Sequence, residues 1–373
     1  MARLVALDLP WDDAFPAALA EVWEGGDAAC VLDRRVAESA RGAELATLSP
    51  TLRRGPHGDV VIDANAEVPD GTALVVASSG SSADPKAAVL SMAAVEASAR
   101  LTSARLGVDP VRHRWLACTP LSHIGGLAVV ARSLVTDTPV TVSAGPGRRH
   151  LGNELAEVSH AAVVSAMLTE ADLSGLEAVL VGGAAPPSSL PPNAVATYGM
   201  TETGSGVVYD GIPLDGVELA VGADGEILLR SPTLATAYRD RTLPLVTLAG
   251  GEPWFPTGDV GSIGDDGRIE VRGRSGEVIS TGGEQVWPAD VERLLAEHAA
   301  VAEVAVTGRA DERFGAIVVA HVVASDPAAP PGIAELAEVV RAAGLPWAVP
   351  RVLELHAALP RLGSGKVDRR ALA

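Results

Sequence analysis

A loop of small and hydroxylated residues that ends in a lysine has the composition of a phosphate-binding site. It runs from Ser78 to Lys86 with the sequence SSGSSADPK. Its glycine lets the backbone approach a ligand, its serines offer hydroxyl donors and its lysine adds positive charge, which together suit a polyanion. The candidate ligand-binding residues of this loop are Ser78, Ser79, Gly80, Ser81, Ser82 and Lys86.

The loop does not match the P-loop pattern of nucleoside triphosphatases. Gly80 lies six residues before Lys86, as that pattern requires, but Pro85 stands where it needs glycine. Ala87 stands where it needs the magnesium-binding serine or threonine. Two interpretations follow from the loop alone, a different kind of nucleotide loop or a Ser/Gly-rich surface loop without a ligand.

Lysine is rare in this chain, and its two positions are informative. Only Lys86 and Lys366 are lysines among the 29 basic residues, and the other 27 are arginines. An ammonium group is a compact point charge that can reach between two oxyanions, whereas a guanidinium is a planar fork. Both lysines lie in loops rich in Gly and Ser, so we expect a chemical role for each.

The composition argues against several classes of protein. A formal net charge of -18 repels nucleic acids and anionic membranes. Cys30 and Cys118 are isolated, without metal or disulfide spacing, as in a reducing compartment. The N-terminal residues become acidic and proline-containing before a signal peptide can form, and no apolar run is long enough to span a membrane. We therefore expect a cytoplasmic protein that binds no nucleic acid and does not insert into membranes.

The elements around the loop indicate an α/β fold. Residues 72–77 predict a buried strand, and the residues after Lys86 predict a helix. Between residues 72 and 200 short apolar runs alternate with helix-length segments, which favours parallel strands. Residues 1–70 predict short helices and turns without obvious chemistry.

A β-rich section and a smaller domain are expected after this region. Asp224-Gly225 and Asp266-Gly267 predict tight hairpin turns between strand-like arms. Beyond residue 274, a helix that begins at Pro288, two strands, a helix over residues 333–343 and a last strand predict a compact α+β unit. We expect a large N-terminal α/β domain over residues 1–273 and a small mobile C-terminal α+β domain over residues 274–373.

Further motifs follow the loop in a fixed order and at sensible spacing. They are PLSHIGG (120–126), VGGAAP (181–186), YGMTE (198–202), TGD (257–259), GR (273–274), GGE (282–284) and PRLGSGK (360–366). From residue 72 to the end, the set resembles the signature motifs of the adenylate-forming superfamily of acyl-CoA synthetases, adenylation domains and luciferases. The resemblance implies activation of a carboxylic acid with ATP and Mg²⁺, followed by transfer to coenzyme A.

The resemblance also implies catalytic roles for four residues. Lys366 would reach between the carboxylate and the α-phosphate, where preorganised positive charge offsets the repulsion of two anions. Glu202 would hold Mg²⁺, and Thr201 would contact phosphate oxygens. His123 would gate the acid pocket. On the residues alone, Glu202 is equally a carboxylate at a helix N-terminus, and His123 a buried structural histidine.

Nucleotide and thiol contacts are implied at the remaining motifs. Tyr198 would stack on adenine, although a core aromatic is the alternative. Asp259 would accept hydrogen bonds from ribose hydroxyls, with Arg274 as its partner, although TGD is also a turn sequence. The other positions implied at the nucleotide and thiol sites are Gly183, Ala184, Gly199, Gly282 and Gly283. The small domain is expected to rotate after adenylation, which would withdraw Lys366 and present the GGE strand.

The sequence departs from the superfamily pattern in three places. Ala83 and Ala87 replace glycines of the usual phosphate loop, and Gly276 stands where the hinge usually carries Asp or Lys. The short N-terminal region and the VISTGGEQV stretch (278–286) resemble ligases of menaquinone biosynthesis that act on an aromatic keto-diacid. Alternatives are another aryl or acyl acid ligase, an enzyme that loads a carrier thiol, and a degenerate nucleotide-binding protein. A homodimer is a candidate assembly.

Overall fold

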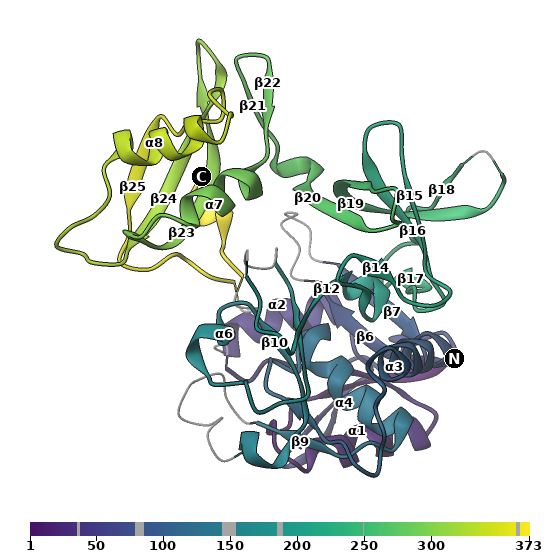
Figure 1. Cartoon of the computed structure of the whole chain (residues 1–373). Helices are drawn as coiled ribbons and strands as arrows, with labels where there is room; N and C mark the ends of the chain where they lie inside the picture. The colour runs from purple at the N-terminus through teal and green to yellow at the C-terminus, as the bar shows by residue number, and fades with distance from the viewer. Residues whose placement is uncertain (36–37, 79–85, 144–153, 185–188, 249, 363–365) are drawn as a thin grey trace. The chain divides into compact units, whose positions relative to one another are not determined.

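The computed structural model describes residues 1–35, 38–78, 86–143, 154–184, 189–248, 250–362 and 366–373 (Figure 1). The chain forms two compact units. One comprises Met1–Leu219 and Leu229–Phe255, and the other comprises Ala220–Leu228 and Pro256–Ala373. The domain boundary expected at residue 274 lies within the second unit and stays a prediction. Among the described helices, none has both the length and the apolar character needed to cross a membrane.

The first unit contains an eight-stranded sheet with the order β17-β7-β6-β2-β1-β3-β4, in which β5 also pairs with β1. β1 runs parallel to β2 and β3, whereas β7 runs antiparallel to β6 and β17, so the sheet is mixed. Its strands are β1 (Ala2–Leu7), β2 (Ala28–Val31), β3 (Leu52–Gly55), β4 (Gly58–Val61), β5 (Glu67–Val68), β6 (Thr72–Ala77), β7 (Ala87–Ser91) and β17 (Ala237–Tyr238).

The segment after the phosphate loop was expected to be helical, and that prediction is wrong for its first five residues. Ala87–Ser91 forms strand β7, which pairs with β6 from Ala77↔Ala87 to Thr72↔Ser91. Helix α3 begins only at Met92, where the Ser91 hydroxyl accepts a hydrogen bond from the Ala94 N–H at 3.2 Å. An apolar run of this kind can form either a helix or a strand, and here it forms a strand because it pairs with β6.

The first 70 residues also differ from expectation. The short helices expected there are α1 (Phe15–Glu24) and α2 (Glu38–Leu48). The same region nevertheless contributes β1 to β5 to the first sheet, and buried residues such as Leu4, Ala28 and Cys30 belong to its core. This part of the chain is therefore integral to the sheet that carries the phosphate loop, not a separate layer.

The second sheet of this unit confirms the α/β prediction. Its order is β14-β13-β12-β11-β10-β8-β9, with parallel pairing from β9 to β12 and antiparallel pairing at β13 and β14. Helices α3 (Met92–Leu106) and α4 (Ile124–Thr136) pack on each other (Figure 1). α3 contacts β6 and β7 of the first sheet and β13 of the second, and α4 contacts β8, β9, β10 and β13 of the second. The strands are β8 (Trp115–Ala117), β9 (Val140–Val142), β10 (His160–Val164), β11 (Ala178–Gly182), β12 (Ala194–Met200), β13 (Ser205–Tyr209) and β14 (Ile212–Pro213), and a short helix α6 spans Met167–Glu170.

The predicted hairpins lie in a third sheet, with the order β15-β16-β19-β18 and β20 paired to β19. Both Asp-Gly pairs connect strands as expected, the first between β15 and β16 and the second between β19 and β20. Strands β15, β16 and β19 each contain residues of both units. The strand bounds are β15 (Glu218–Val221), β16 (Glu226–Arg230), β18 (Val246–Thr247), β19 (Pro253–Ile263) and β20 (Ile269–Arg274).

The C-terminal part of the second unit is the predicted α+β fold. Its five-stranded sheet has the order β22-β21-β24-β23, and β25 pairs parallel with β24. Two helices cover one face, and Val291, Leu336 and Val318 belong to the core between them and the sheet. The elements are β21 (Ile279–Thr281), β22 (Glu284–Val286), α7 (Pro288–Ala296), β23 (Val301–Asp311), β24 (Gly315–Ala324), α8 (Ile333–Ala342) and β25 (Val352–Leu355).

Candidate active site

The two ends of the phosphate loop are held together by strand pairing. Ser78 follows β6 and Lys86 precedes β7, and the Ser78 N–H donates a hydrogen bond of 2.7 Å to the Lys86 carbonyl. Ser79, Gly80, Ser81 and Ser82 lie outside the described residues. Ser78 and Lys86 are therefore the two candidate phosphate ligands of this loop that the structure places.

Lys86 and Glu202 meet around an aromatic ring that the sequence analysis did not identify. The Lys86 Nζ lies 5.3 Å from the centroid of the Tyr238 ring, a cation–π distance. The Tyr238 hydroxyl donates a hydrogen bond of 2.8 Å to Oε1 of Glu202. Tyr238 and Glu202 are both buried, at 5% and 9% exposure. The expected metal ligand and the loop lysine thus belong to one side-chain cluster in the first unit.

The YGMTE motif forms a strand end followed by a tight turn. Tyr198 and Gly199 lie on β12, and Thr201 and Glu202 begin a short 3₁₀ turn over Thr201–Thr203. The Thr203 hydroxyl accepts a hydrogen bond from the Met200 N–H at 2.9 Å, which fixes the turn. A Cβ on Gly199 would lie 2.2 Å from the Ser205 carbonyl oxygen on β13, so no larger residue fits there.

The adenine-wall motif lies on the neighbouring strand. Gly183 and Ala184 directly follow β11, which is parallel to β12 with Val181 opposite Ala196. The Thr197 hydroxyl donates a hydrogen bond of 3.1 Å to the Val181 carbonyl and ties the two strands together. Gly183, Ala184 and the YGMTE motif therefore occupy the same edge of the second sheet, which is where ligands bind in open parallel sheets.

His123 lies at the N-cap of α4, beside a buried carboxylate from the N-terminal region. Asp33 is 5% exposed and accepts two hydrogen bonds from the Arg35 guanidinium, at 2.9 and 2.6 Å. The Ser122 hydroxyl donates a longer bond of 3.4 Å to the same carboxylate. Burial acts to raise the pKa of Asp33, but the bonds from Arg35 and the charge of His123 outweigh it and lower the pKa. No local sequence signal indicates Asp33, because it lies about 90 residues before the motif that it contacts.

In the second unit, the two residues expected to bind the ribose lie next to each other. Asp259 on β19 and Arg274 on β20 are register partners, and Arg274 Nε lies 2.8 Å from Asp259 Oδ1. The Arg274 guanidinium also donates a 3.3 Å bond to the Thr257 carbonyl. The carboxylate is nearly buried, whereas the arginine is about half exposed. The pair thus presents a fixed acceptor, as recognition of two hydroxyls requires.

Lys366 belongs to the same unit and is electrostatically coupled to this pair. The Leu362 N–H donates a 2.8 Å bond to the Lys366 carbonyl, and Arg361 pairs with Val367 in an antiparallel bridge. Residues 363–365 lie outside the described residues. Desolvation lowers the pKa of Lys366, the charge of Arg274 lowers it further, and Asp259 and Glu277 oppose the shift.

The GGE motif is a hairpin turn. Gly282 and Gly283 connect β21 to β22, with Thr281 opposite Glu284. Both glycines have positive φ, 60° and 91°, which a two-residue turn of this kind requires. The first unit therefore carries Lys86, Tyr198 and Glu202, whereas the second carries Asp259, Arg274, Lys366 and this turn.

Comparison with known families is consistent with these motifs. The chain matches the AMP-binding enzyme family over residues 27–239 and the AMP-binding enzyme C-terminal domain over residues 290–366. The chain belongs to the AMP-binding enzyme family. The resemblance to adenylate-forming enzymes inferred from the motifs is thereby confirmed.

Among relatives of this AMP-binding enzyme is a probable 2-succinylbenzoate–CoA ligase of Mycobacterium tuberculosis. The two are 42% identical over 331 residues, which is 82% of this chain and 85% of the relative. A 2-succinylbenzoate–CoA ligase of Bacillus cereus is 30% identical over 337 residues, 80% of this chain and 69% of the relative.

Solved structures confirm the two-part fold of the AMP-binding enzyme. The o-succinylbenzoate CoA synthetase of Bacillus subtilis, in complex with its acyl-adenylate intermediate, matches with a TM-score of 0.84 at 23% identity. That match covers 99% of this chain and 88% of the other. An ATP-bound enzyme from Rhodopseudomonas palustris matches with a TM-score of 0.85 at 19% identity, over 100% of this chain and 88% of the other.

Proposed function

We propose that this AMP-binding enzyme is an ATP-dependent ligase that joins 2-succinylbenzoate to coenzyme A through an acyl-adenylate, a step of menaquinone biosynthesis. The observation that carries the proposal is the 42% identity to the mycobacterial ligase across 82% of the chain. The cluster of Lys86, Tyr238 and Glu202 supports it, because it combines positive charge with a fixed carboxylate at the end of a phosphate loop.

The proposed reaction has two steps. In the first, a carboxylate oxygen of the acid attacks the α-phosphorus of ATP, and pyrophosphate leaves with the electron pair of the broken P–O bond. In the second, the sulfur of coenzyme A attacks the acyl carbon, and AMP leaves. Adenylation is needed because a free carboxylate would have to expel oxide, whereas AMP is a far better leaving group.

Residues of the first unit would hold the triphosphate and its metal. Ser78 and Lys86 would contact phosphate oxygens, together with Ser79, Gly80, Ser81 and Ser82 of the loop, and Thr201 would do so from the YGMTE turn. Glu202 fits a magnesium ligand, because carboxylate oxygens suit this hard cation and Tyr238 already holds Oε1 in place. Mg²⁺, when bound, would neutralise phosphate charge.

The remaining motif residues would place the nucleoside and offset charge in the first step. Tyr198 would stack on adenine beside Gly183, Ala184 and Gly199. Asp259 would accept the ribose hydroxyls while Arg274 keeps it oriented. Lys366 would lie between carboxylate and α-phosphate, a contact typically worth about 10²–10³ in rate. Desolvation and the charge of Arg274 lower its pKa.

Residues 1–273 and 274–373 would act as the two functional domains, with the GGE hairpin presented to the thiol after rotation. His123 would close one side of the acid pocket. We further propose a cytoplasmic enzyme that binds no nucleic acid. Size-exclusion chromatography with light scattering would establish whether it is the homodimer considered above.

ATP–pyrophosphate exchange with a panel of acids tests this function directly. We expect exchange with 2-succinylbenzoate and, after addition of coenzyme A, formation of its thioester. Exchange with other benzoates but not with 2-succinylbenzoate would replace the proposed acid by another aryl acid. Exchange without thioester formation from coenzyme A would indicate a carrier-loading enzyme. Absence of exchange with every acid would reject the ligase and favour a degenerate nucleotide-binding protein.

A further inference from the structure

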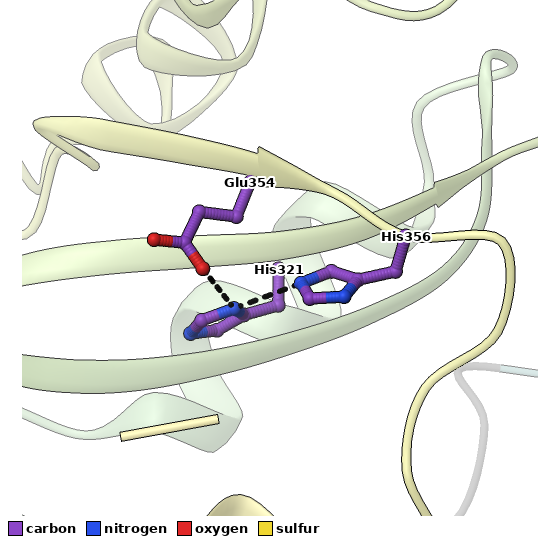
Figure 2. A group of neighbouring side chains, drawn as sticks. All are labelled: His321, Glu354 and His356. Atoms are coloured by element: carbon purple, nitrogen blue, oxygen red, sulfur yellow. Dashed lines mark hydrogen bonds and ion pairs between the residues drawn. The ribbon is translucent and has the colours of Figure 1, made fainter. Parts of the chain in front are cut away.

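Three potential metal ligands converge in the C-terminal part of the second unit, apart from the motifs described above. Figure 2 shows His321, Glu354 and His356 with their polar atoms directed toward one another. His321 Nδ1 lies 3.2 Å from His356 Nε2 and 3.3 Å from Glu354 Oε2. The three ligand atoms all lie within 4.8 Å of one another, and no other such group occurs among the described residues.

Strand alternation explains why these side chains share one face of the sheet. On β24, Val318, Ala320 and Val322 belong to the core beneath α7 and α8, so His321 points to the opposite face. His321 is opposite Glu354 in the parallel pairing of β24 with β25. His356 follows two residues later, just beyond the end of β25. Backbone register, rather than chance rotamers, therefore brings the three residues together.

Neighbouring polar residues hold these three side chains in place, as outer residues do around bound metal ions. The Thr307 hydroxyl on β23 lies 2.9 Å from Nε2 of His321, which leaves Nδ1 to face the other two ligands. Arg309 pairs with Oε1 of Glu354, while Oε2 faces His321. Outer hydrogen bonds of this kind fix the tautomer and ring orientation of ligating histidines and are typical of metal sites.

The hydrogen bonds of this cluster depend on the tautomer of His321. If its Nε2–H donates to Thr307, Nδ1 is an acceptor that faces a carboxylate oxygen, which is also an acceptor. If the Thr307 hydroxyl donates to Nε2 instead, Nδ1–H can donate to Glu354 but then faces the His356 nitrogen as well. His321 is fully buried, so water cannot relieve this contact at its ring. A single cation between the three atoms would satisfy all of them.

We propose that His321, Glu354 and His356 bind a divalent transition-metal ion, with Zn²⁺ as the expected occupant. Zinc bonds of about 2.0–2.1 Å in a tetrahedron place neighbouring ligand atoms roughly 3.3–3.4 Å apart. The two distances from His321 Nδ1, 3.2 and 3.3 Å, match this spacing before any rearrangement. Two imidazoles and one carboxylate are a common zinc ligand set, and a water would complete the tetrahedron. The half-exposed Glu354 and His356 can close the remaining distance by rotation.

The ion would fasten β25 and the segment after it to β24. This role is independent of acid activation, since none of the three residues belongs to the motifs assigned to ATP, the acid or coenzyme A. Mg²⁺ would not substitute, because it prefers oxygen ligands in an octahedral arrangement.

Two experiments on the full-length protein test the proposal. The metal-free protein is titrated with ZnCl₂ in a calorimeter, and its zinc content is measured after dialysis. The protein should carry no polyhistidine tag. After dialysis, the wild-type protein should hold one more zinc ion per chain than the variants His356→Gln and Glu354→Gln. In calorimetry, each variant should bind zinc at least ten-fold more weakly than wild type. Thr307→Val should weaken zinc binding by roughly 10–100-fold, because it removes only the outer contact.

Two control variants separate this site from other zinc-binding groups. His57→Gln removes an exposed histidine elsewhere and should keep the full zinc content. Glu202→Gln should also keep it, which excludes zinc at the proposed magnesium position. Circular dichroism should show the same fold in every variant. If wild type, His356→Gln and Glu354→Gln retain equal zinc, or if none retains any, the cluster is a hydrogen-bond network and the proposal is wrong.

Discussion

The hydroxyl of Tyr238 donates a hydrogen bond of 2.8 Å to Oε1 of Glu202. Tyr238 lies on β17, which pairs with β7, the strand that follows the phosphate loop. The first sheet therefore determines where the carboxylate of the YGMTE turn lies, although that turn follows a strand of the second sheet. Tyr238 thus contacts both the proposed metal ligand Glu202 and one proposed phosphate ligand, Lys86.

Tyr238→Phe should therefore reduce adenylation by about 10–100-fold, since a hydrogen bond to a charged group contributes about 1.5–3 kcal/mol. The expected cause is a displaced Glu202 carboxylate, so the Mg²⁺ concentration needed for half-maximal rate should rise as well. ATP–pyrophosphate exchange at varied Mg²⁺ measures both effects. Tyr209→Phe is the matched control, because Tyr209 is also buried but bonds to Thr102. Equal losses in the two variants would indicate a general effect on folding.

Lys366→Ala should abolish the first half-reaction and spare the second. The ammonium offsets repulsion between carboxylate and α-phosphate only during adenylation, so the loss should be about 10²-fold or more. Thioester formation from synthetic acyl-adenylate and coenzyme A should stay within about three-fold of wild type. Arg370→Ala removes a nearby exposed cation and should leave both steps unchanged. A similar loss in both steps would contradict the assigned role of Lys366.

Asp33→Asn should destabilise the protein by about 1–3 kcal/mol at pH 7, because it leaves the Arg35 guanidinium without its carboxylate partner. Urea unfolding measures the change, with the exposed Asp215→Asn as control. The folded-state pKa of Asp33 is lowered, so its stabilisation is present above its unfolded pKa and is lost as pH falls through the folded value. The difference between wild type and variant should therefore shrink below about pH 4.

His160 should make stability depend on pH in a mildly acidic range. Its ring packs on Trp115 and His113, at centroid distances of 5.1 and 4.9 Å. Burial, with the charge of His113, lowers the pKa of His160 to about 4. Between this value and 6.5 the unfolded chain binds a proton that the native protein does not, so stability falls as pH drops. The shift corresponds to at most roughly 3 kcal/mol.

His160→Phe keeps an aromatic ring and removes this titration. Its free energy of unfolding should change less than that of wild type between pH 6.5 and 4.5, as measured by urea unfolding at several pH values. His57→Gln, at an exposed histidine, should retain the wild-type slope. A variant slope equal to that of wild type would assign the pH dependence to other groups.

The parts of the fold with strong local signals could be predicted from the sequence. Asp224-Gly225 and Asp266-Gly267 connect strands as expected, because a tight hairpin turn favours those residues. Helix α7 begins at Pro288, since proline is tolerated in the first turn. In contrast, Ala87–Ser91 looked helical because alanine favours helices, and only its pairing with β6 makes it a strand.

Contacts between distant segments could not be predicted in this way. Tyr238 lies in a two-residue strand with no periodic pattern, and its partner Glu202 is 36 residues away. Asp33 carries no local signal of a site, and only the folded structure brings it into contact with Ser122, next to His123. His321 interrupts an apolar strand, and nothing around it indicates that Glu354 and His356 lie opposite. Such pairs depend on strand register, which a single sequence does not specify.

The position of β17 in the chain has a consequence for biosynthesis. Residues 220–228 belong to the second unit, and the chain then returns to the first unit before β17 is made. Until residue 238 leaves the ribosome, β7 presents an open edge to other nascent chains, and such edges promote aggregation. A stop or a long ribosomal pause between residues 91 and 237 should therefore leave an intermediate that depends on chaperones.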